Sequence, residues 1–118
     1  MRYHETEHRI RLYGIDAPED KQPFSARAKQ ALSSLVFGQR VTAEVVATDF
    51  YKRKVCIVRV DGKSVSVQMV ADGFAWWYRK YAPDDRQLAG SEVAARQAKR
   101  GLWADANPVP PWEWRRRK

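Results

Sequence analysis

An arginine and two acids near the start of the chain have the chemical character that cleavage of a phosphodiester bond requires. Arg11 is followed five residues later by Asp16 and three residues after that by Glu19. Phosphodiester hydrolysis needs a positioned water and neutralisation of the charge that grows on the phosphate oxygens; a carboxylate, guanidinium groups and a hard cation can supply both. Arginine suits this task better than lysine because its planar fork holds two phosphate oxygens at once.

A second arginine, Arg53, lies far along the chain in a polar connection between two β-rich stretches. Folding could bring it to the same place as Arg11. Each residue also has a simpler interpretation: Arg11 as a solvated strand residue, Glu19 as an ordinary loop acid and Arg53 as a turn cation. Residue types and spacing leave these alternatives open.

The elements around these residues follow from hydrophobic periodicity. Alternation over residues 6–13 predicts a strand that Gly14 ends. Residues 15–23, with two prolines and three acids, have the composition of a loop. Apolar residues at helical spacing over 24–36 predict an amphipathic helix, with Gly38 as a left-handed stop.

Later segments predict further strands and helices. They are a hairpin of residues 41–47 and 55–60, a short helix capped by Ser66 and running to Val70, an aromatic β-prone stretch at 74–81, and a last helix opened by Asp84 and Asp85 and closed by Gly101. Together the elements predict an α+β domain around a small β-barrel with three helices. Residues 107–118 hold three prolines and four terminal cations, so we expect an extended tail, with Arg115 to Lys118 as a solvated run whose deletion barely alters turnover.

Length and charge set limits on the class of protein. With 118 residues we expect a single domain, residues 1–118. The net charge of +8 favours a polyanionic partner such as nucleic acid, although a basic surface can serve solubility alone. No stretch approaches the ~18 consecutive apolar residues of a membrane span, so no membrane partner is expected. The lone Cys56 lies in an apolar stretch, which predicts a buried thiol without chemistry.

Two segments carry a resemblance to a known family. The run RIRLYGIDAPE, from Arg9 to Glu19, resembles the signature of the staphylococcal nuclease-like family: a strand arginine, then aspartate, a small residue, proline and glutamate. The segment TDFYKR, residues 48–53, is similar to the family's threonine-aspartate-x-tyrosine-glycine-arginine, and the GLW at 101–103 also fits. The resemblance implies a five-stranded OB-type β-barrel, from which we expect the first strands to be missing here.

The resemblance also implies an activity and the roles of particular residues. It implies a calcium-dependent nuclease, similar to thermonuclease, that hydrolyses DNA and RNA with low sequence specificity and leaves 3′-phosphates. By motif position, Arg11 and Arg53 clamp the scissile phosphate, and Glu19 orients or activates the attacking water. Family members are frequently exported, which suggests a secreted or periplasmic location.

Metal and substrate contacts follow by the same correspondence. Asp16 is the implied calcium ligand, with the backbone carbonyl of Ala17 beside it and Glu19 acting through a water. Tyr51 and Tyr81 match family tyrosines near the bound nucleotide, although packing at the barrel rim is the commoner role of an aromatic ring. Lys52 is a further candidate phosphate contact.

The sequence departs from the family pattern at two places. Lys52 stands where the family has a turn glycine; if that position needs a positive φ, the lysine is strained and Arg53 can be displaced. The family's acidic Asp-Gly-Asp-Thr-like segment is also absent, so we expect weak calcium binding. The alternative is therefore a catalytically weak or inactive nucleic-acid-binding module on the same fold. Missing strands would also expose a barrel edge, which predicts either self-association or a chain shortened from a longer natural one.

Overall fold

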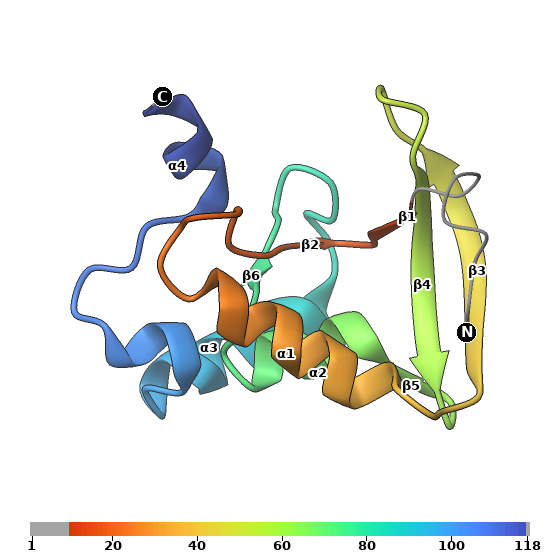
Figure 1. Ribbon diagram of the computed structural model, residues 1–118, viewed down its shortest axis with the longest axis horizontal. Coiled ribbons are helices and arrows are strands. Elements are labelled where there is room, and N and C mark those ends of the chain that lie inside the picture. Colours follow the sequence, from red (N-terminus) through yellow and green to blue (C-terminus); the bar gives the residue numbers. More distant parts are fainter. Residues whose placement is uncertain (1–9, 118) are drawn as a thin grey trace.

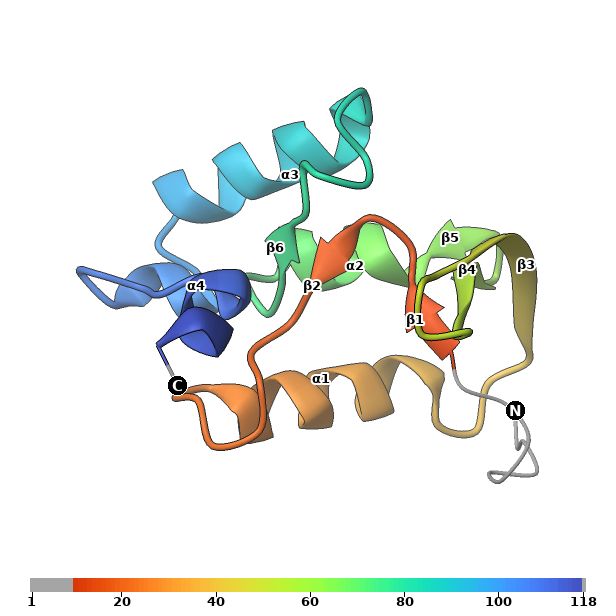
Figure 2. The same ribbon diagram turned by 90° about the horizontal axis from the view of Figure 1, so that it is seen from above.

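The computed structural model describes residues 10–117 and has a mixed α+β architecture (Figures 1 and 2). Its strands are β1 (Ile10–Leu12), β2 (Ile15–Asp16), β3 (Val41–Thr48), β4 (Lys54–Val60), β5 (Lys63–Ser64) and β6 (Trp76–Trp77). Its helices are α1 (Ser25–Val36), α2 (Val65–Ala71), α3 (Arg86–Gln97) and α4 (Pro111–Arg116), with a 3-10 turn, η1, at Gly101–Ala104. The long β3–β4 hairpin stands at one end of the molecule and α4 at the other (Figure 1).

The β3–β4 hairpin forms the centre of the main sheet. The two strands pair antiparallel from Val41 opposite Val60 to Thr48 opposite Lys54, with an irregularity between Val45 and Ala47. β1 pairs in parallel with the other side of β4, and β5 adds to the end of β4. The predicted hairpin is confirmed, and so is a strand within residues 10–13; its expected start at residues 6–9 lies outside the described residues.

The strands described here do not close into a five-stranded barrel. The main sheet has the order β1-β4-β3, and β2 pairs with β6 in a separate two-stranded sheet. Within residues 10–117, β3 has no strand on its outer side, and seven of its eight residues are exposed. The α+β class is thus confirmed, whereas the closed OB-type barrel is not found, because residues 10–117 supply no strand to cover β3.

The core lies between β4 and the helices. Cys56 and Val58 of β4 are buried against Met69 and Val70 of α2 and Leu88 of α3. Burial raises the pKa of the Cys56 thiol, as expected for a small side chain that serves packing. The predicted burial of Cys56 is confirmed.

Side-chain caps begin α2 and α3, and one of the two caps differs from the sequence prediction. Asp85 accepts a hydrogen bond from the Leu88 N–H at 3.0 Å and begins α3, as the sequence predicted. The short helix α2, in contrast, is capped by Ser64 and not by Ser66. The Ser64 hydroxyl accepts from the Val67 N–H at 3.2 Å, while Ser66 is buried inside the helix.

The C-terminal tail was predicted to be extended over residues 107–118, and this prediction is wrong for Pro111–Arg116. Pro111 occupies the first helical position, where its fixed φ suits a helix and its missing N–H costs nothing. Glu113 lies in the first turn and two arginines lie in the last, an arrangement that the helix dipole favours. Pro111 therefore marks the start of a helix and does not indicate an extended tail.

Trp112 anchors α4 to the body of the domain. Its ring stacks on Tyr78 with centroids 5.2 Å apart and planes at 17°, and it meets Trp76 edge-on at 5.6 Å. Trp76 in turn packs with Trp103 of η1 in the second cluster of buried residues. As a result α4 lies beside β6 and the loop that follows β2, two segments that are far from it in the sequence (Figure 2).

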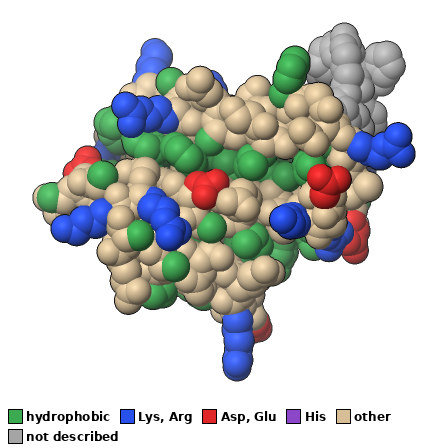
Figure 3. Space-filling view, turned by 90° about the horizontal axis from the view of Figure 1, so that it is seen from below, with side chains coloured by type: hydrophobic (Ala, Val, Ile, Leu, Met, Phe, Trp, Pro, Cys, Tyr) green, Lys and Arg blue, Asp and Glu red, His purple; other side chains and the backbone are tan. Residues whose placement is uncertain are grey.

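The underside of the molecule is formed largely by helices. Figure 3 shows a band of hydrophobic side chains across this face, with Lys and Arg on either side of it. A shallow groove between α1 and the segment after α2 includes Phe24, Leu35 and Phe74 in its lining. None of the helices within residues 10–117 is long and apolar enough to cross a membrane.

Candidate active site

One pocket gathers the chemically active residues from five separate parts of the chain. It has a volume of about 500 Å³ and lies where β1, the loop after β2, the β3–β4 turn, the segment after β6 and α4 converge. We call it the active pocket. Its lining residues are Arg11, Asp16, Glu19, Tyr51, Arg53, Tyr78, Tyr81 and Arg115.

The pairing of β1 with β4 explains how two distant arginines reach the active pocket. Arg11 lies opposite Val55 in the parallel register, and Arg53 precedes Val55 by two residues. Arg53 directly precedes β4, so the pairing of β1 with β4 brings it to the same end of the sheet as Arg11, where both side chains line the active pocket.

Asp49 fixes the turn that carries Arg53. Its Oδ1 accepts from the backbone N–H groups of Tyr51 and Arg53, both at 2.9 Å, and its Oδ2 accepts from the Arg53 Nε at 2.7 Å. Desolvation raises the pKa of Asp49, but the hydrogen bonds and charge of Arg53 outweigh it and hold this pKa below its ordinary value. A charged carboxylate thus orients the Arg53 guanidinium.

Lys52 adopts the strained conformation that its place in the turn requires. Its φ is +64°, in the region that favours glycine, and its side chain is exposed. The strain does not remove Arg53 from the active pocket, which Arg53 still lines. Lys52 itself is not among the lining residues.

Tyrosine rings surround the two guanidinium groups. The Arg11 guanidinium carbon lies 4.8 Å from the ring centroid of Tyr81 and 5.2 Å from that of Tyr78. The Arg53 guanidinium carbon lies 5.7 Å from the Tyr51 centroid. Such contacts hold the planar groups against ring faces and leave their N–H edges available to an anion.

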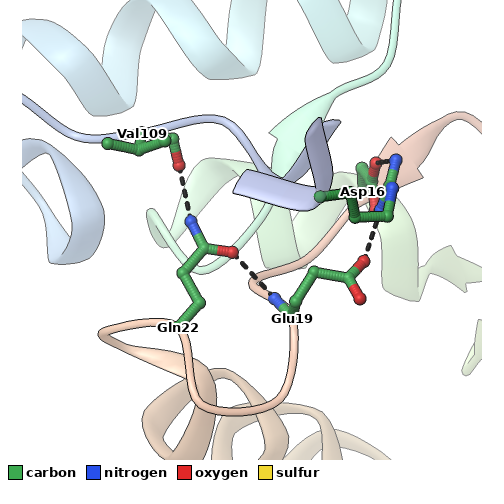
Figure 4. A network of polar contacts seen from close by, with 5 residues as sticks. Asp16, Glu19, Gln22 and Val109 are labelled. Carbon is green, nitrogen blue, oxygen red and sulfur yellow. Dashed lines mark hydrogen bonds and ion pairs between the residues drawn. The ribbon is translucent and has the colours of Figure 1, made fainter. Parts of the chain in front are cut away.

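Two carboxylates, those of Asp16 and Glu19, also line the active pocket. Asp16 ends β2 and pairs with Trp76 of β6, which fixes its backbone. Glu19 lies in the following loop, where its N–H donates to the Gln22 Oε1 at 2.8 Å. The Gln22 Nε2 donates to the carbonyl of Val109 at 2.7 Å, so one side chain ties the Glu19 loop to the C-terminal segment (Figure 4).

Removing the Gln22 amide is expected to loosen this loop. Gln22 is 5% exposed, and Gln22→Ala leaves the Glu19 N–H and the Val109 carbonyl without their partner in partly buried positions. We expect the free energy of unfolding to fall by about 1–3 kcal/mol, measured by urea denaturation. Gln30→Ala, on the exposed face of α1, is the matched control, and an equal effect of both changes would contradict the role of Gln22.

Arg115 of α4 binds both carboxylates, which corrects its interpretation as part of a solvated tail. Its Nη2 donates to the Asp16 Oδ2 at 2.9 Å, its Nη1 lies 3.5 Å from the Asp16 Oδ1, and Nη1 also pairs with Glu19. Desolvation lowers the pKa of Arg115, but its hydrogen bonds to the two acids raise it more. Burial raises the pKa of Asp16, although Arg115 and Arg11 oppose that effect.

The comparison with known proteins assigns the chain to a family. A family model described as "Staphylococcal nuclease homologue" matches residues 9–105, which is most of the chain. The chain belongs to the staphylococcal nuclease family. This confirms the resemblance seen in the sequence, and the match ends before α4, so Arg115 lies outside the matched region.

Several relatives in the staphylococcal nuclease family align over nearly the whole chain. A protein named "Uncharacterized endonuclease" from Escherichia coli O157:H7 is 47% identical over 111 residues, covering 93% of this chain and 72% of the relative. "Micrococcal nuclease" of Shigella flexneri is 39% identical, covering 92% and 68%. "Uncharacterized 38.1 kDa protein" from Capnoides sempervirens is 44% identical over 94% of this chain, but the chain spans only 32% of that relative.

The active pocket contains most of the residues that the staphylococcal nuclease resemblance singled out, and two others. Arg11, Asp16, Glu19, Tyr51, Arg53 and Tyr81 all line it, whereas Lys52 and Ala17 do not. The Ala17 side chain is partly buried and packs against the core. The expected role of the Ala17 backbone carbonyl as a calcium ligand stays a prediction. Sequence reasoning missed Tyr78, although it lies in the aromatic stretch 74–81, and Arg115, whose basic run gave no sign of its partners.

Proposed function

We propose that this chain hydrolyses phosphodiester bonds of DNA and RNA with calcium assistance and low sequence specificity. The observation that carries the proposal is the convergence of Arg11, in β1, and Arg53, in the turn before the neighbouring strand β4, on a pocket that also holds Glu19. Relatives named as an endonuclease and a nuclease align over more than nine-tenths of the chain. Contacts to phosphate alone carry no sequence information, hence the expected low specificity.

In this proposal the two arginines hold the scissile phosphate from the sheet side. Each guanidinium offers a planar pair of N–H donors to the non-bridging oxygens, whose negative charge grows as water attacks. Among residues 10–117, Glu19 is the only glutamate that lines the active pocket, and it orients the attacking water and accepts a proton from it. Tyr51 and Tyr81, which are 64% and 53% exposed, contact the nucleotide next to this phosphate.

The carboxylates fit a calcium ion, although with few ligands. Three carboxylate oxygens, two of Asp16 and one of Glu19, already converge on a single cationic group, the Arg115 guanidinium. No group of three or more His, Cys, Asp or Glu residues suited to a metal ion occurs within residues 10–117, so carbonyl groups, such as that of Ala17, and water would complete the coordination. Calcium bound there would add positive charge beside the phosphate.

Arg115 and a cation would compete for the same oxygens, which gives a test of the metal site. Arg115→Ala is expected to lower the calcium Kd on the order of 10-fold, because binding no longer requires the charge-assisted hydrogen bonds to Asp16 to break. Isothermal titration calorimetry with calcium chloride measures this change. Arg116→Ala removes the same charge from the next position of α4 and should leave the Kd within about twofold. Equal Kd values for both variants would contradict a site at Asp16 and Glu19.

Cleavage of end-labelled denatured DNA and of RNA tests the function itself. We expect both to be cut in calcium and neither in the presence of a chelator, with products that end in 3′-phosphates. The second candidate is a catalytically weak or inactive nucleic-acid-binding module, which the small number of acidic ligands favours. Salt-sensitive binding without cleavage would support that candidate and overturn the nuclease assignment.

A further inference from the structure

We propose that a groove next to the active pocket binds a single-stranded nucleic-acid segment that flanks the scissile phosphate. The groove has a volume of about 750 Å³ and lies between β6, the segment that follows it, α3 and α4. Its aromatic lining includes Trp77, Tyr78 and Trp112, and its cationic lining includes Arg79, Lys80 and Arg116. We call it the aromatic groove; the inference rests on the proposed function for the identity of its ligand.

The groove adjoins the active pocket. Tyr78 and Arg115 line both cavities, so a nucleic-acid strand held at the phosphate site needs only to pass these two side chains to reach the aromatic groove. Tyr78 is T-shaped against Tyr81 in the active pocket, with centroids 4.9 Å apart, and stacks on Trp112 in the groove. A row of rings therefore connects the two sites.

The charge of the groove suits a polyanion. Arg79, Lys80 and Arg116 are exposed, and none of them forms an ion pair with a carboxylate of the described residues. Glu92, the acid in the lining, is 4% exposed. Its carboxylate accepts hydrogen bonds from the Trp77 backbone N–H at 2.9 Å and from the Arg96 Nη2 at 3.2 Å. The accessible charge is thus positive.

The combination of rings and cations favours a single strand over a duplex. Unpaired bases stack on aromatic side chains while the backbone follows a positive groove, and in a duplex those base faces are already stacked. The Arg79 guanidinium carbon lies 4.9 Å from the Trp77 ring centroid, so this cation already lies against an aromatic face. A phosphate of the strand would contact Arg79 and Lys80 while a base stacks near Trp77 or Trp112.

Binding measured without cleavage tests the groove. The probe is a fluorescent single-stranded DNA of about 20 nucleotides, long enough to fill both cavities, titrated in a chelator so that its anisotropy reports affinity alone. The groove variant is Arg79→Ala with Lys80→Ala. The matched control, Arg40→Ala with Lys63→Ala, removes the same charge from exposed positions that line neither the groove nor the active pocket. Circular dichroism establishes that both variants are folded.

The two variants should behave differently. We expect the groove variant to weaken binding about 10-fold or more and to reduce the salt slope by about 1.4, the value for two lost phosphate contacts on a single strand. The control should change affinity by less than about threefold. Equal losses in both variants would overturn the groove, even if the wild-type chain cleaves DNA in calcium. A selective loss in the groove variant would support the groove, even if the wild-type chain proves inactive.

Discussion

Glu19→Gln is expected to lower kcat on denatured DNA by about 10²–10⁴-fold, the usual contribution of a positioned general base. The amide keeps the size and the hydrogen-bonding reach of the carboxylate but cannot take a proton from water. The loop should keep its shape, because it is the backbone N–H of residue 19 that Gln22 holds. Initial rates of cleavage in calcium, at saturating substrate, measure the effect.

Glu113→Gln is the matched control for this change. Glu113 is an exposed acid in the first turn of α4 and does not line the active pocket. Its substitution should leave kcat within about twofold, as for most surface changes. A similar kcat for both variants would show that Glu19 is not the general base and serves only as an ion-pair partner of Arg115.

Arg11→Lys is expected to reduce kcat by about 10²–10³-fold, as is typical when one donor to the developing charge is lost. Lysine keeps the positive charge but offers no planar pair of N–H donors, and it fits less well between ring faces. Substrate affinity should change much less, because the electrostatic attraction is retained. Single-turnover rates and binding measured in a chelator separate the two quantities.

The control for this change is Arg59→Lys. Arg59 also belongs to the main sheet, but its Nη1 binds Glu44 at 3.0 Å and it lies outside the active pocket. The same chemical change there should have little effect on rate. If Arg11→Lys kept more than about half of the wild-type rate, Arg11 would not be a clamp that depends on the guanidinium shape.

Local patterns predicted the elements well where a single segment determines them. Alternation predicted the β3–β4 hairpin, and Asp85 predicted the start of α3 through its bond to the Leu88 N–H. The closed barrel could not be predicted from one segment, because closure requires a distant strand to pair with the outer side of β3. Within residues 10–117 no strand does so. Self-association through this edge stays a prediction.

The site was predictable to the extent that it follows from motif positions. Arg11, Asp16 and Glu19 lie within nine residues of each other, and the parallel pairing of β1 with β4 brings Arg53 to them. Arg115 could not be found in this way, because its contacts to Asp16 and Glu19 span more than ninety residues. The clue was Pro111: read as the first residue of a helix, it places Arg115 on α4 and not in a solvated tail.

Whether Arg11 and Arg53 act on one phosphate is best measured by a double-mutant cycle. Single-turnover cleavage of denatured DNA in calcium is compared for the wild-type chain, Arg11→Lys, Arg53→Lys and the double variant. Groups that act as one unit are strongly non-additive, so we expect the double variant to lose at least about tenfold less than the product of the two single losses. Losses that multiply to within about twofold, or a wild-type chain that does not cleave, would contradict a shared phosphate clamp.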